Sequence, residues 1–504
     1  MDIILKNTVS NYLCFIAKVV SGLILTSLLY NGLGKESYGF WVLLWSVYGY
    51  TLLLDFGFGF SIQKSSAEYV HKKDLTKLLR QINSIFFSYV FLAIGIVIFS
   101  LAFLYTCGSL FVAELGDPYY QNVYLFFAVV TAIIFPTGIF SEILVGLGHI
   151  YLRNIVRLVF ISTNAVGILL MPEIKILELT VFSLLLHLIA NLFLLYFVKK
   201  KISCFSLSIK YFDKSEVREL MRFSLSAYVV IFTNLILFNS DQIILSSIAG
   251  VGSVGIYHLA TRLPFFMKML NEQFQENVFP LLVSKRNIKF DMILTGNKFS
   301  LVKFISFISN LSFSFAFVFA EEIIYIWIGE TNPEIILIAH LSLCYSFIAT
   351  LFKSINNSYL MANDQVSKVV RFSLLEVILN LALTFLLVPL IGVVGAVVAS
   401  LLALFISLLF YVPYFVKQID VHFSIWYKKI FKKNNLVLLI NLSALSIVKL
   451  VLNNDYGLLY IATLALVSGL LYLYMFFNFV WDEYKFNNKY LYFVKRYSLD
   501  WKGR

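Results

Sequence analysis

The sequence predicts an all-α polytopic membrane protein with about 14 transmembrane helices and almost no folded mass outside the bilayer. Two observations carry this prediction. Of the 504 residues, 60% are hydrophobic and only 13% are charged, which is about half the charged share of a soluble domain. Apolar runs near the ~20 residues that a helix needs to cross ~30 Å of hydrocarbon recur along the whole chain.

Each apolar run is expected to form one spanning helix. The N-terminus has no A-x-A-like cleavage site, so the first run is expected to remain a helix and not to act as a signal peptide. The runs cover residues 9–33, 38–62, 83–108, 122–146, 151–172, 176–198, 222–249, 254–283, 299–328, 334–361, 369–390, 392–416, 434–453 and 456–480.

The basic residues are concentrated in every second connection between these runs. The formal charge is +12, but alternate connections hold only two cations, Lys35 and Lys175. Cytoplasmic loops of membrane proteins carry an excess of Lys and Arg, so the basic connections and both termini are expected in the cytoplasm. This distribution explains the positive charge without nucleic acid, which is not an expected partner.

The sequence offers no metal or cofactor site. The four cysteines are scattered without a C-x-x-C pair, and none of the six histidines belongs to an H-E-x-x-H motif. We expect buried free thiols, no metal and no cofactor. The longest outer connection, near residues 108–121, is too short for a catalytic domain, so an enzyme is not expected.

The chain contains an internal repeat. Gly34–Trp41 and Gly250–Tyr257 share the pattern G-x-x-S-x-G followed by an apolar and an aromatic residue, 216 positions apart. Six helices per repeat give both halves the same orientation, related by an axis along the membrane normal, with a central cleft between them. The predicted bundles cover residues 1–210 and 211–420, and helices 13 and 14 with a cytoplasmic tail cover 421–504.

Charged residues within the expected spans are candidates for a wetted cavity, because a charge in the membrane costs at least ~2.5 kcal/mol on insertion scales. Asn234 joins them because it aligns with Lys18 in the repeat and shares a helix face with Asp241. Lys268 and Glu272 could instead neutralise each other, and Lys449 is expected to anchor a helix end at the interface. The cavity candidates are Lys18, Asn234, Arg262, Lys268 and Lys353 among cationic or neutral residues, and Asp55, Glu142 and Asp241 among acids.

These features together resemble the polysaccharide-repeat flippases of the multidrug/oligosaccharidyl-lipid/polysaccharide exporter superfamily. The resemblance covers the whole chain and includes the helix count, the two halves and the cytoplasmic termini. Each motif is loose, but their order and spacing are more specific. The matching motifs are Gly34–Trp41, Asp55–Gly57, Asp241–Leu245 with Gly255–Tyr257, and Gly392–Ser400 after Pro389.

The resemblance implies a multi-pass protein of the bacterial cytoplasmic (inner) membrane. Such a protein would move undecaprenyl-diphosphate-linked O-antigen, lipopolysaccharide or capsule repeat units to the outer leaflet by alternating access. Lys18 and Arg262 could then hold the diphosphate, with Asn234, Lys268 and Lys353 as further contacts. Related members couple to ion gradients, so the acids Asp55, Glu142 and Asp241 could carry H+ or Na+. Membrane lipids, a polysaccharide polymerase and a chain-length regulator are the implied partners.

Three alternatives remain open on the sequence. A multidrug exporter of the same fold would favour acidic residues in the cleft, and a lipid II flippase would favour more cleft arginines than Arg262. A membrane glycosyltransferase or polymerase would need a sizeable outer loop with catalytic residues. The sequence does not specify the sugar repeat, the coupling ion or the oligomeric state.

The predicted topology can be tested by labelling single cysteines in intact cells with a membrane-impermeant thiol reagent. Sites near Glu114 and Asn332 should react from outside, whereas sites near Lys73, Lys210 and Lys429 should be protected. Reaction from outside near Lys210 would overturn both the orientation and the helix count.

Overall fold

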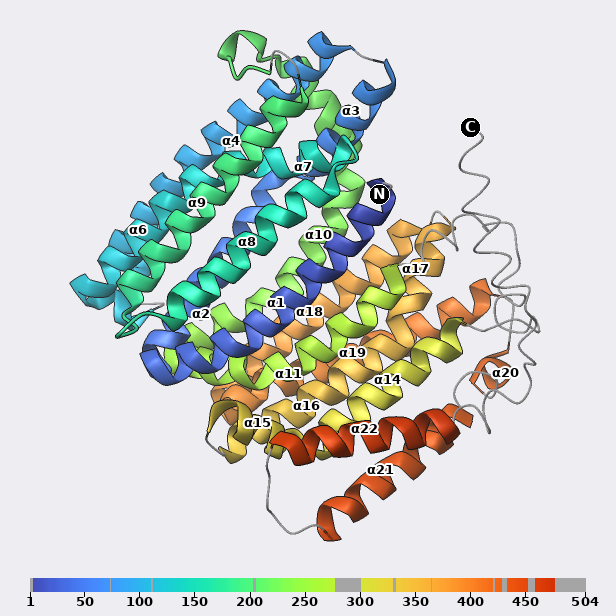
Figure 1. Cartoon of the computed structure of the whole chain (residues 1–504). Helices are drawn as coiled ribbons and strands as arrows, with labels where there is room; N and C mark the ends of the chain where they lie inside the picture. The colour runs from blue at the N-terminus through green and yellow to red at the C-terminus, as the bar shows by residue number, and fades with distance from the viewer. Residues whose placement is uncertain are drawn as a thin grey trace. The chain divides into compact units, whose positions relative to one another are not determined.

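A computed structural model of the chain consists of helices joined by short turns (Figure 1). Within the part that it describes, all regular secondary structure is helical. The described residues are 3–72, 74–109, 112–202, 205–276, 301–329, 332–363, 365–419, 422–427, 433–451 and 458–475. The expected cytoplasmic labelling sites at Lys73 and Lys429 lie outside these residues, as does most of the expected tail.

The described residues of the first repeat form eight α-helices. Several of them are joined by 3-10 or π-helical turns, namely η1 (Leu52–Asp55), η2 (Leu104–Gly108), η3 (Ala113–Gly116) and η4 (Phe135–Gly138). The helices are α1 (Ile3–Leu33), α2 (Lys35–Thr51), α3 (Phe58–Lys72), α4 (Leu75–Phe103), α6 (Pro118–Ile134), α7 (Ile139–Gly146), α8 (Ile150–Leu169) and α9 (Ile176–Lys201).

The rest of the chain continues in the same manner after the short η5 (Ile209–Tyr211), with η6 (Thr350–Ser354) as a π-helical turn. The helices of the second repeat are α10 (Lys214–Ala249), α11 (Val251–Glu276), α14 (Leu301–Val318), α15 (Ala320–Ile328), α16 (Pro333–Ala349), α17 (Ile355–Ala362), α18 (Val366–Ile391) and α19 (Val393–Gln418). The last helices are α20 (Phe423–Tyr427), α21 (Lys433–Val451) and α22 (Leu458–Met475).

The predicted helical class is confirmed, and each predicted apolar run coincides with one helix or with consecutive helices. In the described part, eight helices are long and apolar enough to cross a membrane, or up to ten if each of two bent pairs is one span. The remaining runs coincide with α10, α11, α21 and α22, which are helical over most of the predicted residues.

Both bent pairs consist of two apolar helices with a short break between them. The span formed by α2 and α3 bends by 54°, where Phe56 (φ 47°) and Gly57 (φ 75°) adopt left-handed backbone conformations. The span formed by α14 and α15 bends by 69°. Helix breaks at membrane depth expose backbone groups that need partners, so polar side chains are expected near them.

The chain divides into two compact units, each built from several separate segments. The first comprises Met1–Phe266, Trp327–Ser342 and Ser367–Ser407, and the second comprises Met267–Ile326, Leu343–Val366 and Leu408–Arg504. These units do not coincide with the two halves of the sequence repeat, so the boundaries predicted at residues 210 and 420 stay a prediction.

In the first unit, α4, α6, α9 and α8 lie side by side, and α1 packs along α8 (Figure 1). A buried core joins α3, α4 and α7 through Ile62, Ile82 and Ile143, none of which is exposed to solvent. Many apolar side chains on the other faces of these helices are exposed, among them Phe91, Ile98 and Phe99 of α4. Such faces suit a hydrocarbon surround.

The repeated G-x-x-S-x-G motif begins at a turn between two helices in each half. Gly34 separates α1 from α2 with φ 77°, and Gly250 separates α10 from α11 with φ 81°. Residues other than glycine rarely adopt this backbone conformation, so glycine permits the chain to reverse directly from one helix into the next.

The second glycine of each motif lies where the two repeats cross. A Cβ atom on Gly39 would overlap the carbonyl oxygen of Val251, and a Cβ atom on Gly255 would lie 2.9 Å from the carbonyl oxygen of Lys35. Gly39 is equivalent to Gly255 in the repeat, and Lys35 to Val251. The two contacts are therefore reciprocal, as a two-fold relation between the halves requires, and we call them the glycine crossing.

The connection between the repeats is fastened to the start of α4. The side chain of Asn83, which is fully buried, accepts a hydrogen bond from the backbone N–H of Ser208 at 2.7 Å. The hydroxyl of Ser84, also fully buried, accepts one from the backbone N–H of Asp213 at 2.9 Å. Side chains of the first repeat thus satisfy the backbone of the connection and fix where α10 begins.

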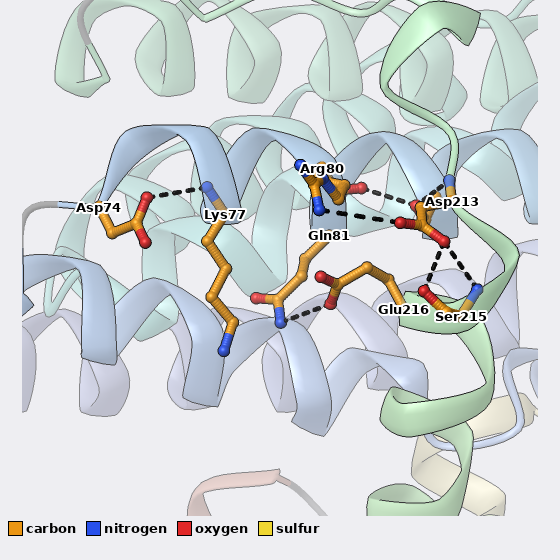
Figure 2. Close-up of polar contacts among 8 residues, drawn as sticks. Asp74, Lys77, Arg80, Gln81, Asp213, Ser215 and Glu216 are labelled. Atoms are coloured by element: carbon orange, nitrogen blue, oxygen red, sulfur yellow. Dashed lines mark hydrogen bonds and ion pairs between the residues drawn. The ribbon is translucent and has the colours of Figure 1, made fainter.

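Charged and polar side chains extend this attachment (Figure 2). Arg80 lies 3.8 Å from the Asp213 carboxylate, and Gln81 donates to Glu216 at 3.0 Å. Hydrogen bonds from the hydroxyl and backbone N–H of Ser215 lower the pKa of Asp213, which caps the N-terminus of α10. A carboxylate in this position is further favoured by the helix dipole.

In the second unit, α21 is attached to the break between α14 and α15. Lys449 of α21 was predicted to anchor a helix end at the interface; its ammonium group lies 2.6 Å from the Glu322 carboxylate and donates to the Val318 carbonyl at 3.2 Å. Glu322 is 1% exposed. A second contact lies two turns earlier in α21, where Asn441 donates to Ser314 at 2.8 Å.

Removing the cation from this buried pair should destabilise the protein. Lys449→Met leaves the Glu322 carboxylate buried without its partner, which should lower the free energy of unfolding by about 3 kcal/mol. The double variant with Glu322→Gln should recover most of this loss because no charge remains. Thermal unfolding of the purified protein in detergent measures both effects.

Lys175→Met provides the matched control, since the Lys175–Glu173 ion pair at 3.1 Å is largely exposed. Its effect on unfolding should be within about 0.5 kcal/mol. If Lys449→Met and Lys175→Met unfolded at the same temperature, the buried pair would not stabilise the attachment of α21.

Candidate functional site

The most buried carboxylate of the first unit is surrounded by hydroxyl groups from three other helices. Asp241 of α10 is 2% exposed. Tyr257 of α11 donates to its Oδ2 atom at 2.7 Å, Thr384 of α18 donates to Oδ1 at 3.3 Å, and Ser400 of α19 lies 3.4 Å from Oδ2. Four helices therefore converge on one acidic side chain.

Asn380, one turn before Thr384 on α18, completes this group. Its side chain is fully buried and donates to Ser400 at 2.9 Å, whereas its Oδ1 atom has no hydrogen-bond donor in the described part of the chain. Carboxylate, amide and hydroxyl oxygens are the ligands of hard cations. The sequence pattern indicated Asp241 but not the four neutral residues, although Asn380 and Thr384 share a helix face at the i, i+4 spacing.

The first repeat holds only part of this arrangement. Ser183 of α9 donates to Asn164 of α8 at 3.0 Å, and Asn164 is equivalent to Asn380 in the repeat. The position equivalent to Asp241 is Leu25. The first repeat thus keeps a polar pair but has no acid there.

The other two acids of the sequence prediction, Asp55 and Glu142, lie near each other beside the break between α2 and α3. Asp55 accepts hydrogen bonds from the Tyr89 hydroxyl and from the backbone N–H of Gly59 at 3.2 Å. Glu142 accepts one from Gln63 at 2.5 Å. A Cβ atom on Gly59 would lie 3.5 Å from both acidic side chains. Both carboxylates therefore already accept hydrogen bonds from the protein. These hydrogen bonds stabilise the break between α2 and α3, whether or not a ligand binds there.

The repeat helps to place Arg262. On one side of the first unit, Ser46 of α2 donates to Gln242 of α10. Arg262 is equivalent to Ser46 in the repeat, and Thr26 of α1 is equivalent to Gln242. The two-fold relation of the halves therefore directs Arg262 of α11 toward α1.

Arg262 has an unpaired donor in the described part of the structure. Its Nε atom is buried without a hydrogen-bond acceptor, and its guanidinium group lies 5.5 Å from the centre of the Phe265 ring. One turn earlier on α11, His258 is hydrogen-bonded through Nδ1 to the Tyr38 hydroxyl at 2.7 Å. Since a guanidinium group has only donors, an anion would satisfy the free N–H.

Lys18 lies on the helix that faces Arg262. A Cβ atom on Gly22 of α1 would lie 3.1 Å from the Phe266 ring of α11, so this ring packs against α1 at Gly22. Lys18 is one turn before Gly22 and Arg262 is one turn before Phe266, on helices of opposite direction. Each cation therefore lies roughly 6 Å along its helix from the contact between Gly22 and Phe266, and the two cations lie on opposite sides of that contact.

The structure also describes the helices that carry the remaining three predicted residues. Asn234 lies in α10, but its side chain is outside the described part. In the second unit, Lys268 lies 3.6 Å from Glu272, the local pairing considered from the sequence. Lys353, also in the second unit, belongs to the π-helical turn η6 and lies 5.9 Å from the centre of the Tyr411 ring.

Helical spans with polar groups buried between them define a polytopic membrane protein, and comparison with known proteins specifies the family. Residues 4–285 match the family described as polysaccharide biosynthesis protein. The match covers more than half of the chain, so the chain belongs to this family. No curated protein matches the sequence.

Solved structures of transporters share the fold. The chain resembles the lipid II flippase MurJ in an inward closed conformation, with a TM-score of 0.73 and 16% identity over 94% of this chain and 99% of that one. It also resembles an inward-facing multidrug resistance MATE transporter of the MOP superfamily, with a TM-score of 0.63 and 14% identity over 82% and 99%. A MOP superfamily transporter from Pyrococcus furiosus gives a TM-score of 0.53 and 15% identity over 83% and 96%.

The group around Asp241 predicts a cation-dependent stability. A cation that binds the folded protein at 100 times its dissociation constant stabilises it by about 2.7 kcal/mol. Purified protein should therefore unfold at a higher temperature when Na+ replaces K+ at constant ionic strength, or respond to pH if the cation is H+. Asp241→Asn should abolish the response because the negative ligand is lost.

Asn164→Leu is the matched control, since it alters the equivalent polar pair in the repeat that has no acid. It should retain the wild-type response to the cation. A wild-type response in Asp241→Asn would show that the cation binds elsewhere.

Proposed function

We propose that this protein flips lipid-linked oligosaccharides, carrying undecaprenyl-diphosphate-linked O-antigen or capsule repeat units from the cytoplasmic to the outer leaflet of the bacterial inner membrane. Family membership and the fold support the broader class of lipid-linked substrate flippase or exporter. The single observation that carries the narrower proposal is the placement of Lys18 and Arg262 one turn from the contact between Gly22 of α1 and the Phe266 ring of α11.

A diphosphate headgroup needs such a site because its charge cannot cross hydrocarbon unaided. The free Nε–H of Arg262 would donate to a phosphate oxygen, and Lys18 would attract the same headgroup from the facing helix. The lipid tail can stay in the bilayer while the sugar passes between the halves. Alternating movement of the two repeats would expose the site to each side of the membrane in turn.

Asp241 is proposed to couple this movement to an ion gradient. Its carboxylate connects α10 and α11 with α18 and α19 through three hydroxyl groups, so a bound Na+ or a proton would change the contacts among four helices. Asp55 and Glu142 are the second candidates for this role. A polysaccharide polymerase and a chain-length regulator are the expected protein partners, since they use the product on the outer leaflet.

A lipid II flippase is the second candidate function. It is favoured by the similarity to MurJ, whose fold aligns with 94% of this chain. Lipid II also carries a diphosphate, so the same two cations would serve it. Both candidates therefore share the chemistry of the site and differ in the sugar.

Deletion of the gene should distinguish them. We expect surface polysaccharide to be lost, lipid-linked repeat units to accumulate on the cytoplasmic leaflet, and cell-wall synthesis to continue. Wild-type protein should restore the polysaccharide, whereas the double variant Lys18→Ala/Arg262→Ala should not, because no cation of the proposed site remains. Arg262→Lys should restore part of it if charge matters more than a bidentate geometry.

Lys175→Ala is the control cation, because it lies in an exposed ion pair outside the proposed site. Protein abundance in the membrane must be equal for all variants. Arrest of cell-wall synthesis with accumulated lipid II would identify the alternative function. Normal surface polysaccharide in the double variant would refute the role of Lys18 and Arg262.

A further inference from the structure

The glycine crossing joins the two repeats at one end of the membrane-spanning helices. Its four residues, Gly39, Val251, Gly255 and Lys35, directly follow the turns at Gly34 and Gly250. By the predicted topology this end faces the outside. A transporter that alternates between two sides must separate its halves at this end to release its substrate there.

Glycine is needed at this crossing because backbone meets backbone. A Cβ atom on Gly39 would overlap the Val251 carbonyl, and one on Gly255 would lie 2.9 Å from the Lys35 carbonyl. No flexible side-chain end stands between them that could move aside. A methyl group at either glycine must therefore push α2 and α11 apart.

One hydrogen bond between the two repeats forms a second layer next to the crossing. The Tyr38 hydroxyl lies 2.7 Å from His258 Nδ1, which links α2 of the first repeat to α11 of the second. Tyr38 is 1% exposed. Arg262 lies one turn further along α11, so this layer separates the proposed headgroup site from the glycine crossing.

The second layer is not duplicated by the repeat. The position equivalent to Tyr38 is Val254, and the position equivalent to His258 is Val42. Both valines are buried and can make no hydrogen bond through their side chains. The crossing itself is symmetric, whereas the polar link beside it occurs once, on the side of Arg262.

We propose that the two G-x-x-S-x-G motifs form the outer gate of the transporter, with Gly39 and Gly255 as its closing surfaces and the Tyr38–His258 hydrogen bond as its inner layer. This proposal rests on the proposed function, because the outer end is the release side only if the substrate moves outward. Each release then requires the backbone contacts of the crossing to separate and the single hydrogen bond to break. The repeat explains why the same short motif occurs in both halves.

The gate predicts that a methyl group at the crossing opens a path from outside. Thr26→Cys is a suitable reporter, because Thr26 is 6% exposed and its side chain hydrogen-bonds Tyr38. In a background without native cysteines, an impermeant thiol reagent added to intact cells should react with it slowly. Gly39→Ala or Gly255→Ala should raise the labelling rate by about tenfold or more.

Gly95→Ala is the matched control, since a Cβ atom there would meet nothing within 4 Å. It should leave the labelling rate unchanged. Equal labelling of Thr26→Cys in all three glycine variants would overturn the proposal. This readout needs no substrate, so a response to Gly39→Ala supports the gate even if the transported lipid proves to be different from the one proposed.

Cross-linking tests the gate without disturbing its packing. A Cβ atom on Gly252 would lie 3.1 Å from the Lys35 side chain. A short, reducible thiol-specific cross-linker should therefore join Lys35→Cys to Gly252→Cys readily. The cross-link should stop the appearance of surface polysaccharide, and its reduction should restore the polysaccharide. Normal transport by the bridged protein would overturn the proposal.

A bridge between Gly32→Cys and Ile174→Cys provides the control. A Cβ atom on Gly32 would lie 3.3 Å from the Cβ atom of Ile174, and both residues belong to the first repeat. This bridge should leave transport unchanged, because it does not connect the two halves. Loss of transport with both bridges would show that the reagent and not the closed gate is responsible.

Discussion

Hydrocarbon offers no hydrogen bonds to a protein, and this constraint determines most of the structure. Every backbone N–H and C=O within the bilayer needs a partner from the chain itself, so the spans are helical. Where a span breaks, the partners come from side chains. At the break between α2 and α3, Asp55 accepts a hydrogen bond from the backbone of Gly59. At the break between α14 and α15, Lys449 donates to the carbonyl of Val318.

The same constraint explains what could be predicted from the sequence. Apolar runs predict spans because length and composition decide whether a helix can cross, and the described residues of the predicted runs are mostly helical. The repeated motif predicted the relation of the halves because glycine has a unique backbone freedom. Gly34 and Gly250 adopt positive φ, as such a turn requires.

The polar interior was harder to predict, because a neutral side chain in an apolar run carries little signal on its own. Asp241 could be found because a charge in the membrane is costly. The role of Asn380, Thr384 and Ser400 could not be predicted, because only the fold shows that α18 and α19 pack against α10 at Asp241. The partner of Lys449 could not be predicted, because Glu322 lies more than 120 residues away in the sequence, next to the break between α14 and α15.

Equivalent positions of the repeat show where the two halves have diverged. The glycine crossing is kept on both sides, since each half needs the other's carbonyl to lie close. Asp241 is equivalent to Leu25, and Arg262 to Ser46. The acid of the candidate cation site and the cation of the candidate headgroup site thus both lie in the second repeat.

This asymmetry has a mechanical consequence. If both repeats carried an acid and an arginine, a cation and an anion would each have two sites, and binding would not favour one half over the other. In the proposed mechanism, ion binding at Asp241 would change the contacts of α10 with α18 and α19, whereas headgroup binding at Arg262 would act on α11, the next helix along the chain. Tyr257 of α11 donates to Asp241, so a direct hydrogen bond would link the two events. A symmetric scaffold that opens and closes can in this way be driven by ligands that bind to one side of it.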